Sequence, residues 1–379
     1  MFAGEGGNGS LPLRRIEVDA RQLHLLGSSF ADARLVLAPA ARGTAVQVQA
    51  AGIAGSLLVP EQDGATVAGR FERLFWNVPP GSGAGVGAPA KAASAAPPPS
   101  AGGFDPANIP PLLFEVDDLR IGSAALGSAR FRSTPVAGGM RMDEFSSRGA
   151  RQRLTAGGTW SGRGGAARTQ VKVDVDSDDI GALLAGLGFG GQVAGAGGKL
   201  GLEANWRGGP EAFDPTVMDA RLQVDARDGR LLEIEPGAGR VLGLLGIAQL
   251  PRRLTLDFRD FFDKGFAFDR ITGEVRLAQG VARTDDLTIR GPAADIHVRG
   301  STDLRSQRFD QTVDVLPKSG GLLTAVGALA GGPVGAAVGA VANAMLDKPL
   351  QGLGAKTYRV TGPWSAPKVE VTVRSPAAQ

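Results

Sequence analysis

The sequence predicts a mainly β protein: an elongated, curved antiparallel sheet, with a short Gly/Ala-rich helical element near the C-terminus. Three observations lead to this prediction. Runs of five to ten residues alternate apolar and polar side chains along most of the chain, as half-buried strands do. Gly, at 57 of 379 residues, is about twice its ordinary share, and aromatic residues make up only 6%. Many short strands joined by turns fit this composition better than a helical bundle does.

Residues 1–78 are predicted to form an N-terminal segment of β-strands. The alternating runs there are RRIEVDARQLHL, ARLVLAP, TAVQVQAAGIAGSLLVP and ATVAGRFERLFW. Residues 79–103, PPGSGAGVGAPAKAASAAPPPSAGG, have low complexity and too few apolar side chains to form a core. We therefore predict a flexible linker or loop over residues 79–103.

Residues 104–318 are predicted to form a second, larger region of β-strands. The strand patterns there are LLFEVDDLRI, SARFRSTPV, GMRMDEFSS, ARQRLTAGGTW, TQVKVDVD, KLGLEANW, DARLQVDARDG, RLLEIEP, DRITGEVRL, DDLTIRG, ADIHVRG and FDQTVDVLP. A short helix is predicted in DDIGALLAG, between TQVKVDVD and KLGLEANW. Residues 351–379 contain the closing strands, KTYRVTG and PKVEVTVRS, and a tail.

Alternation in so many strands predicts one long apolar face and one polar face. Trp160, Trp206 and Trp364 each lie among Gly and Pro at the end of a strand pattern. This weak internal repeat favours a series of similar meander units, and so an extended sheet. An ordinary β-sandwich would show the same alternation, because its two inner faces pack against each other. The pattern leaves both arrangements open.

The 28 residues between Lys318 and Asp347 carry no charge, and we expect residues 319–350 to form a Gly/Ala-rich helical pair. Gly331, Gly332 and Pro333 interrupt the run, which favours two short helices over one membrane span. Helices capping a groove, helices inserted into a membrane surface and a true span remain open as alternatives. The candidate membrane-contact residues are Leu322, Leu323, Val326, Leu329, Val334, Val338 and Val341.

Catalytic and cofactor motifs are weak, so an enzyme is the least favoured class. The chain has no Cys, and its two histidines, His24 and His297, are far apart in sequence. Residues 186–191 match GxGxxG, but a helix precedes them and a strand follows, the reverse of a dinucleotide site. Asp174, Asp176 and Asp178 lack the Gly and Glu that complete a calcium loop. We expect no cofactor and no metal site.

The net charge of +3 is small, and basic residues alternate with acidic ones along the strands. Nucleic acid is therefore not an expected partner. The first residues, MFAGEGGNGS, lack the features of a signal peptide, and the strand pattern begins abruptly. Either the protein is cytoplasmic or this chain is the tail of a longer protein, and the abrupt start favours the second.

Several of these runs resemble the C-terminal region of AsmA-like proteins, most closely the YhdP type. The resemblance lies in RLLEIEPGAGRVLGLLGIAQLPRRLTLDFRDFFDKGFAFD, GEVRLAQGVARTDDLTIRGPAADIHVRGSTDL, FDQTVDVLP, GGPVGAAVGA and YRVTGPWSAPKV, and upstream in DSDDIGALLAGLGFGGQVAGAGGKLGLEANWRGGP. It covers roughly residues 104–375. The N-terminal segment fits less distinctly, and residues 79–103 are not part of it.

This resemblance implies a bridge-like lipid transfer protein of Gram-negative bacteria. The family is anchored in the inner membrane and crosses the periplasm as a repeating β-groove that carries phospholipid towards the outer membrane, which implies that residues 104–318 are the β-groove region of this chain. The expected partners are phospholipid and either the inner leaflet of the outer membrane or an outer-membrane protein. The alternative is a non-catalytic periplasmic scaffold or outer-membrane assembly module that binds proteins. Our candidate groove residues are Leu254, Leu256, Phe258, Ile289, Ile296, Val298, Val313, Val315, Val369, Val371 and Val373.

Overall fold

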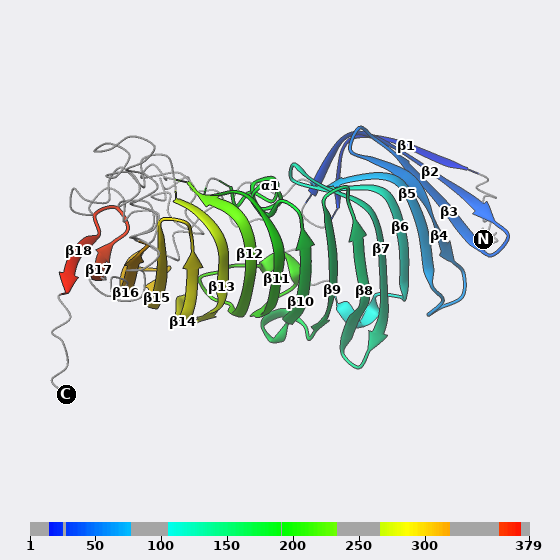
Figure 1. The fold of residues 1–379 in the computed structure, drawn as a ribbon. Helices are drawn as coiled ribbons and strands as arrows, with labels where there is room; N and C mark the ends of the chain where they lie inside the picture. The colour runs from blue at the N-terminus through cyan, green and yellow to red at the C-terminus, as the bar shows by residue number, and fades with distance from the viewer. Residues whose placement is uncertain are drawn as a thin grey trace, which may run out of the picture.

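The described residues form one 18-stranded sheet. The computed structural model describes residues 15–25, 28–76, 105–190, 192–232, 266–318 and 356–372. Figure 1 shows the strands as a long, curved row of ribs, with the N-terminal strands at one end and the C-terminal strands at the other. The predicted fold class is confirmed: the chain is mainly β, and its sheet is elongated, curved and unclosed.

The N-terminal part contributes five strands, and the remaining described residues contribute thirteen. The first group is β1 (Ile16–Leu25), β2 (Ser28–Ala40), β3 (Gly43–Gln49), β4 (Ile53–Pro60) and β5 (Val67–Trp76). The second group is β6 (Leu112–Ile121), β7 (Ala124–Val136), β8 (Gly139–Arg148), β9 (Gln152–Ser161), β10 (Arg168–Ser177), β11 (Val193–Arg207), β12 (Asp219–Leu231), β13 (Phe266–Ala278), β14 (Val281–Arg290), β15 (Ala294–Asp303), β16 (Arg308–Pro317), β17 (Lys356–Pro363) and β18 (Lys368–Thr372).

Helical structure in the described residues is limited to short segments. The α-helix α1 spans Ile180–Gly186, and the 3-10 turns are η1 (Pro106–Asn108), η2 (Gly164–Ala166) and η3 (Pro210–Ala212). The helix expected in DDIGALLAG is confirmed as α1. Asp179 caps it by accepting a hydrogen bond from the Ala182 amide, which explains why the helix begins there.

Each strand pairs with the strands that precede and follow it in the sequence, and the pairing is antiparallel at every junction except one. The exception is β5 with β6, which run parallel. Parallel neighbours need a connection that returns along the full strand length. Residues 77–111, which include the predicted linker, make this return, and residues 77–104 lie outside the described part of the chain.

Two predicted strand boundaries are wrong. The run TAVQVQAAGIAGSLLVP forms two strands, because the chain turns at Ala50–Gly52. Conversely, DARLQVDARDG and the start of RLLEIEP form one strand, β12. Asp228, with φ +55°, produces a kink opposite Ala196, and pairing with β11 and β13 continues on both sides of it. An Asp-Gly pair that is typical of a hairpin turn here bends a single strand.

The two faces of the sheet differ in polarity, as the alternation predicts. Apolar side chains gather in three clusters on one face. The first includes Phe30, Ile53 and Leu126 from β2–β7, the second extends from α1 over β11–β17, and the third is centred on Trp206 and Leu277. Several pairings contain register shifts, which strengthen the local twist and help the sheet to curve.

Candidate functional site: the apolar face of the sheet

The middle of the apolar face is only partly covered. Val173 on β10 lies opposite Ala156 on β9 and Leu202 on β11, and Leu202 in turn lies opposite Leu222 on β12. Each of these side chains is half-buried. The half-buried residues of this stretch, which we call the central strip, are Leu154, Ala156, Val171, Val173, Val175, Leu200, Leu202, Leu222 and Val224.

None of the central-strip residues is among the candidate groove residues predicted from the sequence. The signal for the strip was present, since TQVKVDVD and DARLQVDARDG alternate clearly. Alternation identifies the face to which a side chain belongs, but its exposure depends on what packs above it. The sequence therefore predicted the strip as strand structure without identifying it as the accessible part of the face.

Aromatic side chains continue the apolar face towards the N-terminal end. Phe71 and Phe114 meet edge to face with ring centroids 5.9 Å apart, and Phe114 stacks on Phe131 at 6.1 Å. Phe131 lies opposite Phe145 in the β7–β8 register. The row runs over the parallel β5–β6 junction, so the apolar face remains continuous where the strand direction changes.

At the C-terminal end the same face is closely packed. Ile289, Ile296, Val298, Val313 and Val315 are cross-strand neighbours and belong to one cluster, as the predicted shared face requires. All five are buried, with exposed fractions of 3% or less. Lipid contact at these positions stays a prediction.

The remaining candidates lie at the edge or outside the described residues. On β18, Val369 packs against the same cluster, whereas Val371 is 46% exposed. The structure does not describe Leu254, Leu256, Phe258 and Val373, nor the candidate membrane-contact residues Leu322, Leu323, Val326, Leu329, Val334, Val338 and Val341.

The opposite face carries rows of cross-strand ion pairs. Arg130 on β7 donates a hydrogen bond of 2.6 Å to Glu115 on β6, and Arg270 on β13 contacts both carboxylate oxygens of Asp225 on β12, at 3.0 and 2.8 Å. These hydrogen bonds and positive charges hold the pKa of Glu115 and of Asp225 below their ordinary values. Paired charges of this kind keep the face solvated.

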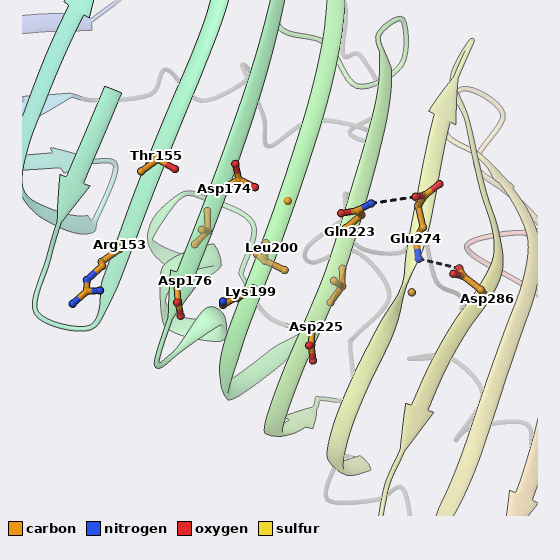
Figure 2. Close-up of a pocket in the computed structure, with 14 residues that line it drawn as sticks. Arg153, Thr155, Asp174, Asp176, Lys199, Leu200, Gln223, Asp225, Glu274 and Asp286 are labelled. Carbon is orange, nitrogen blue, oxygen red and sulfur yellow. Dashed lines mark hydrogen bonds between the residues drawn. The ribbon is translucent and has the colours of Figure 1, made fainter. Parts of the chain in front are cut away.

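Figure 2 shows a shallow hollow on this polar face, of about 720 Å³. Gly201, which has no side chain, lines the hollow. Charged residues of both signs line it too, including Asp174, Lys199 and Glu274. Glu274 accepts a hydrogen bond from Gln223, and its backbone amide donates to Asp286 at 2.9 Å. These polar groups of the hollow therefore bond to one another across neighbouring strands, as on an ordinary solvated face.

The described residues contain no group of three or more His, Asp or Glu side chains placed to bind a metal ion. His24 interacts with Ser29 at 2.8 Å, and His297 with Thr288 at 3.2 Å, on strands β1 and β15 at opposite ends of the sheet. Among the helices described, none has the length and hydrophobicity needed to cross a membrane.

Comparison with known families agrees with the geometry of the apolar face. A family model described as YhdP protein matches residues 3–369. The chain belongs to the YhdP family. The match includes the N-terminal strands, for which the sequence resemblance was less distinct.

A curated relative of this YhdP-family chain is the intermembrane phospholipid transporter YhdP of Escherichia coli (strain K12). The two are 31% identical over 226 residues, which is 59% of this chain and 18% of the relative. The matched part is thus less than a fifth of the length of the relative. No solved structure matches the chain.

Proposed function

We propose that this YhdP-family chain carries phospholipid along the apolar face of its sheet, as the distal part of a periplasmic protein that connects the inner and outer membranes. The observation that carries the proposal is a continuous apolar face on an unclosed sheet, only half-buried along the central strip. The named function of the E. coli relative supports the same cargo.

The physical need for such a face follows from the size of the cargo. A diacyl phospholipid has roughly 30 methylene groups, each worth about 0.8 kcal/mol in transfer from water, or about 24 kcal/mol in all. Free diffusion of a lipid across an aqueous gap is therefore negligible. A strip of aliphatic side chains removes this barrier if neighbouring positions bind an acyl chain about equally well.

The composition of the central strip supports similar binding of an acyl chain at neighbouring positions. Its lining consists of Val, Leu and Ala side chains at each step from β9 to β12, with no charged residue on the same face. We place the acyl chains against this strip and the headgroup towards solvent. The candidates Ile289, Ile296, Val298, Val313 and Val315 would contact lipid only after the C-terminal cluster opens, because they are buried.

The proposal includes two finer points. The chain works in the periplasm as part of a protein anchored in the inner membrane, and residues 319–350 contact the outer membrane or a protein in it. Their charge-free, Gly/Ala-rich composition supports the second point.

Native mass spectrometry of the purified chain tests the cargo. We expect phospholipid to co-purify with the wild-type protein and to be lost from Val173→Glu and Leu202→Glu, because a buried carboxylate next to an acyl chain is strongly unfavourable. Gln170→Glu is the matched control: it adds the same charge to the polar face of β10 and should keep its lipid. A folded, lipid-free wild-type chain would contradict the proposal and favour a protein-binding scaffold.

A further inference from the structure

The helix α1 occupies a special place on the apolar face. It connects β10 to β11 and also contacts β7, although β8 and β9 lie between β7 and β10 in the sheet. Figure 1 shows it at the ends of the ribs, near the middle of the row. Ile180 and Leu184 pack into the C-terminal cluster, whereas Leu183 and Leu187 pack into the N-terminal one. The helix therefore crosses the junction between the two clusters.

The N-terminal end of α1 is firmly held. Asp179 caps the helix and also pairs with Arg151, at 3.1 Å, in the turn between β8 and β9. The Asp179 amide donates to the Ser177 hydroxyl at 3.1 Å. Gly181 lies so close to β11 that a Cβ atom there would come within 2.5 Å of the Val193 carbonyl oxygen. Several independent contacts thus fix this end.

The C-terminal end of α1 touches the β6–β7 turn through Ser123. The Ser123 amide donates to the Gly186 carbonyl at 2.9 Å, and the Ser123 hydroxyl donates to the same carbonyl at 3.5 Å. The contact needs glycine, because a Cβ atom on Gly186 would lie 2.7 Å from the backbone of Ala124. The helix ends at Gly186, and Gly188, whose φ is +91°, and Gly190 follow it. Leu183 and Leu187 also pack at this end, but hydrogen bonds from one exposed serine take the place of the cap and ion pair at Asp179, and glycines follow, an arrangement common in hinged segments.

The residues beside this contact are covered much better than the central strip. Leu126 and Ala124 are 1% and 5% exposed and share a cluster with Leu183, whereas Val173 is only half-buried. We propose that α1 is a lid on the apolar face, fixed at Asp179 and latched at Gly186, and that its release admits an acyl chain from the side. The inference rests on the proposed lipid cargo.

The substitution Gly186→Ala should disturb the latch and leave the helix α1 itself intact. The added methyl group collides with the Ala124 backbone, yet Ala is a better helix former than Gly, so α1 itself should persist. We expect exchange of a fluorescent phospholipid between the protein and vesicles to quicken on the order of fivefold, the effect of losing one ordinary hydrogen bond. Gly165→Ala is the control, since an added Cβ there meets no atom. Wild-type exchange in Gly186→Ala would overturn the lid.

A reversible cross-link tests the same lid in the opposite direction. The chain has no Cys, so Ser123→Cys and Ala185→Cys, both at exposed positions, introduce the only thiols. Joining them with a bis-thiosulfonate linker should stop lipid exchange, and reduction should restore it. Unchanged exchange in the cross-linked protein would contradict the lid.

Hydrogen exchange of the Ser123 amide separates failure of the lid from failure of the lipid proposal. If the wild-type chain binds no lipid, the proposed function fails, but the latch still predicts faster Ser123 exchange in Gly186→Ala than in Gly165→Ala. Equal Ser123 exchange in the two variants would overturn the latch whether or not lipid binds.

Discussion

Ile296 and Val371 belong to the same apolar face but have different surroundings. Ile296 lies between Ile289 and Val315 on neighbouring strands and is fully buried. Val371 lies on the edge strand β18, opposite Tyr358, and is 46% exposed. A residue of the first kind contributes chiefly to stability, whereas a residue of the second kind is free to contact a partner.

The first prediction concerns this contrast. Ile296→Ala removes buried methyl groups and leaves a cavity, so we expect the free energy of unfolding to fall by about 2–4 kcal/mol. Val371→Ala should change it by less than about 0.5 kcal/mol. Urea unfolding followed by circular dichroism measures both values. Similar losses in the two variants would contradict the difference in packing.

The second prediction concerns acid. Arg130 holds the pKa of Glu115 below its ordinary value of 4.5, and Arg270 holds the pKa of Asp225 below 3.8. A carboxyl whose pKa is lower in the folded state stabilises the fold above its unfolded pKa, and this contribution is lost as pH falls through the folded pKa. The urea midpoint should be constant from pH 7 to about pH 5 and fall below about pH 4.5. Arg130→Gln should weaken this fall, whereas a steeper fall in that variant would contradict the assigned cause.

The sequence predicted the face of each strand residue better than its exposure. It placed Ile289, Ile296, Val298, Val313 and Val315 on one face, and the register confirms this. The alternation does not reveal that these five residues are buried while Val173 and Leu202 are only half-buried. Exposure depends on contacts between segments distant in sequence, such as α1 with β7, which no local pattern records.

At the scale of elements, the parallel pair β5–β6 is the main departure from a simple meander. Val67 pairs with Leu112 and Trp76 with Ile121. The chain therefore leaves β5 where one set of strand ends lies and enters β6 where the opposite set lies. Alternation is the same in parallel and antiparallel strands, so the sequence could not reveal the direction. The low-complexity segment between them was the available signal, since antiparallel neighbours need only a short turn.

The third prediction follows from this crossover. A ten-residue strand is roughly 33 Å long, and the connection must return that distance. Deleting residues 81–95 leaves enough chain, so the thermal midpoint should shift by less than about 2 °C. Deleting residues 78–104 leaves only residue 77 and residues 105–111, which span roughly 30 Å when fully extended. This segment must also reverse direction at both ends of the connection, so we expect a large loss of stability. Equal stability of both deletion variants would contradict the parallel pairing.

At the scale of the whole molecule, each strand contacts chiefly its neighbours in sequence, as in repeat proteins. The sequence predicted the elongated sheet from the repeated alternation, but it left a sandwich open, because both bury one face of every strand. The pairing decides between them: in the described residues the strands follow one another in a single row, and no pairing joins β1 to β18. The apolar face therefore extends along the molecule without closing on itself.

The fourth prediction tests the central claim, that lipid travels on the apolar face. A photo-reactive amino acid is placed in turn at Val171, Val173 and Val175, and at Gln170, Lys172 and Asp174, on opposite faces of β10. After irradiation in cells, mass spectrometry of the purified protein detects covalent phospholipid. We predict adducts at the three valine positions and none at the three polar ones. Equal labelling of both faces, or no lipid adduct at any position, would contradict the account.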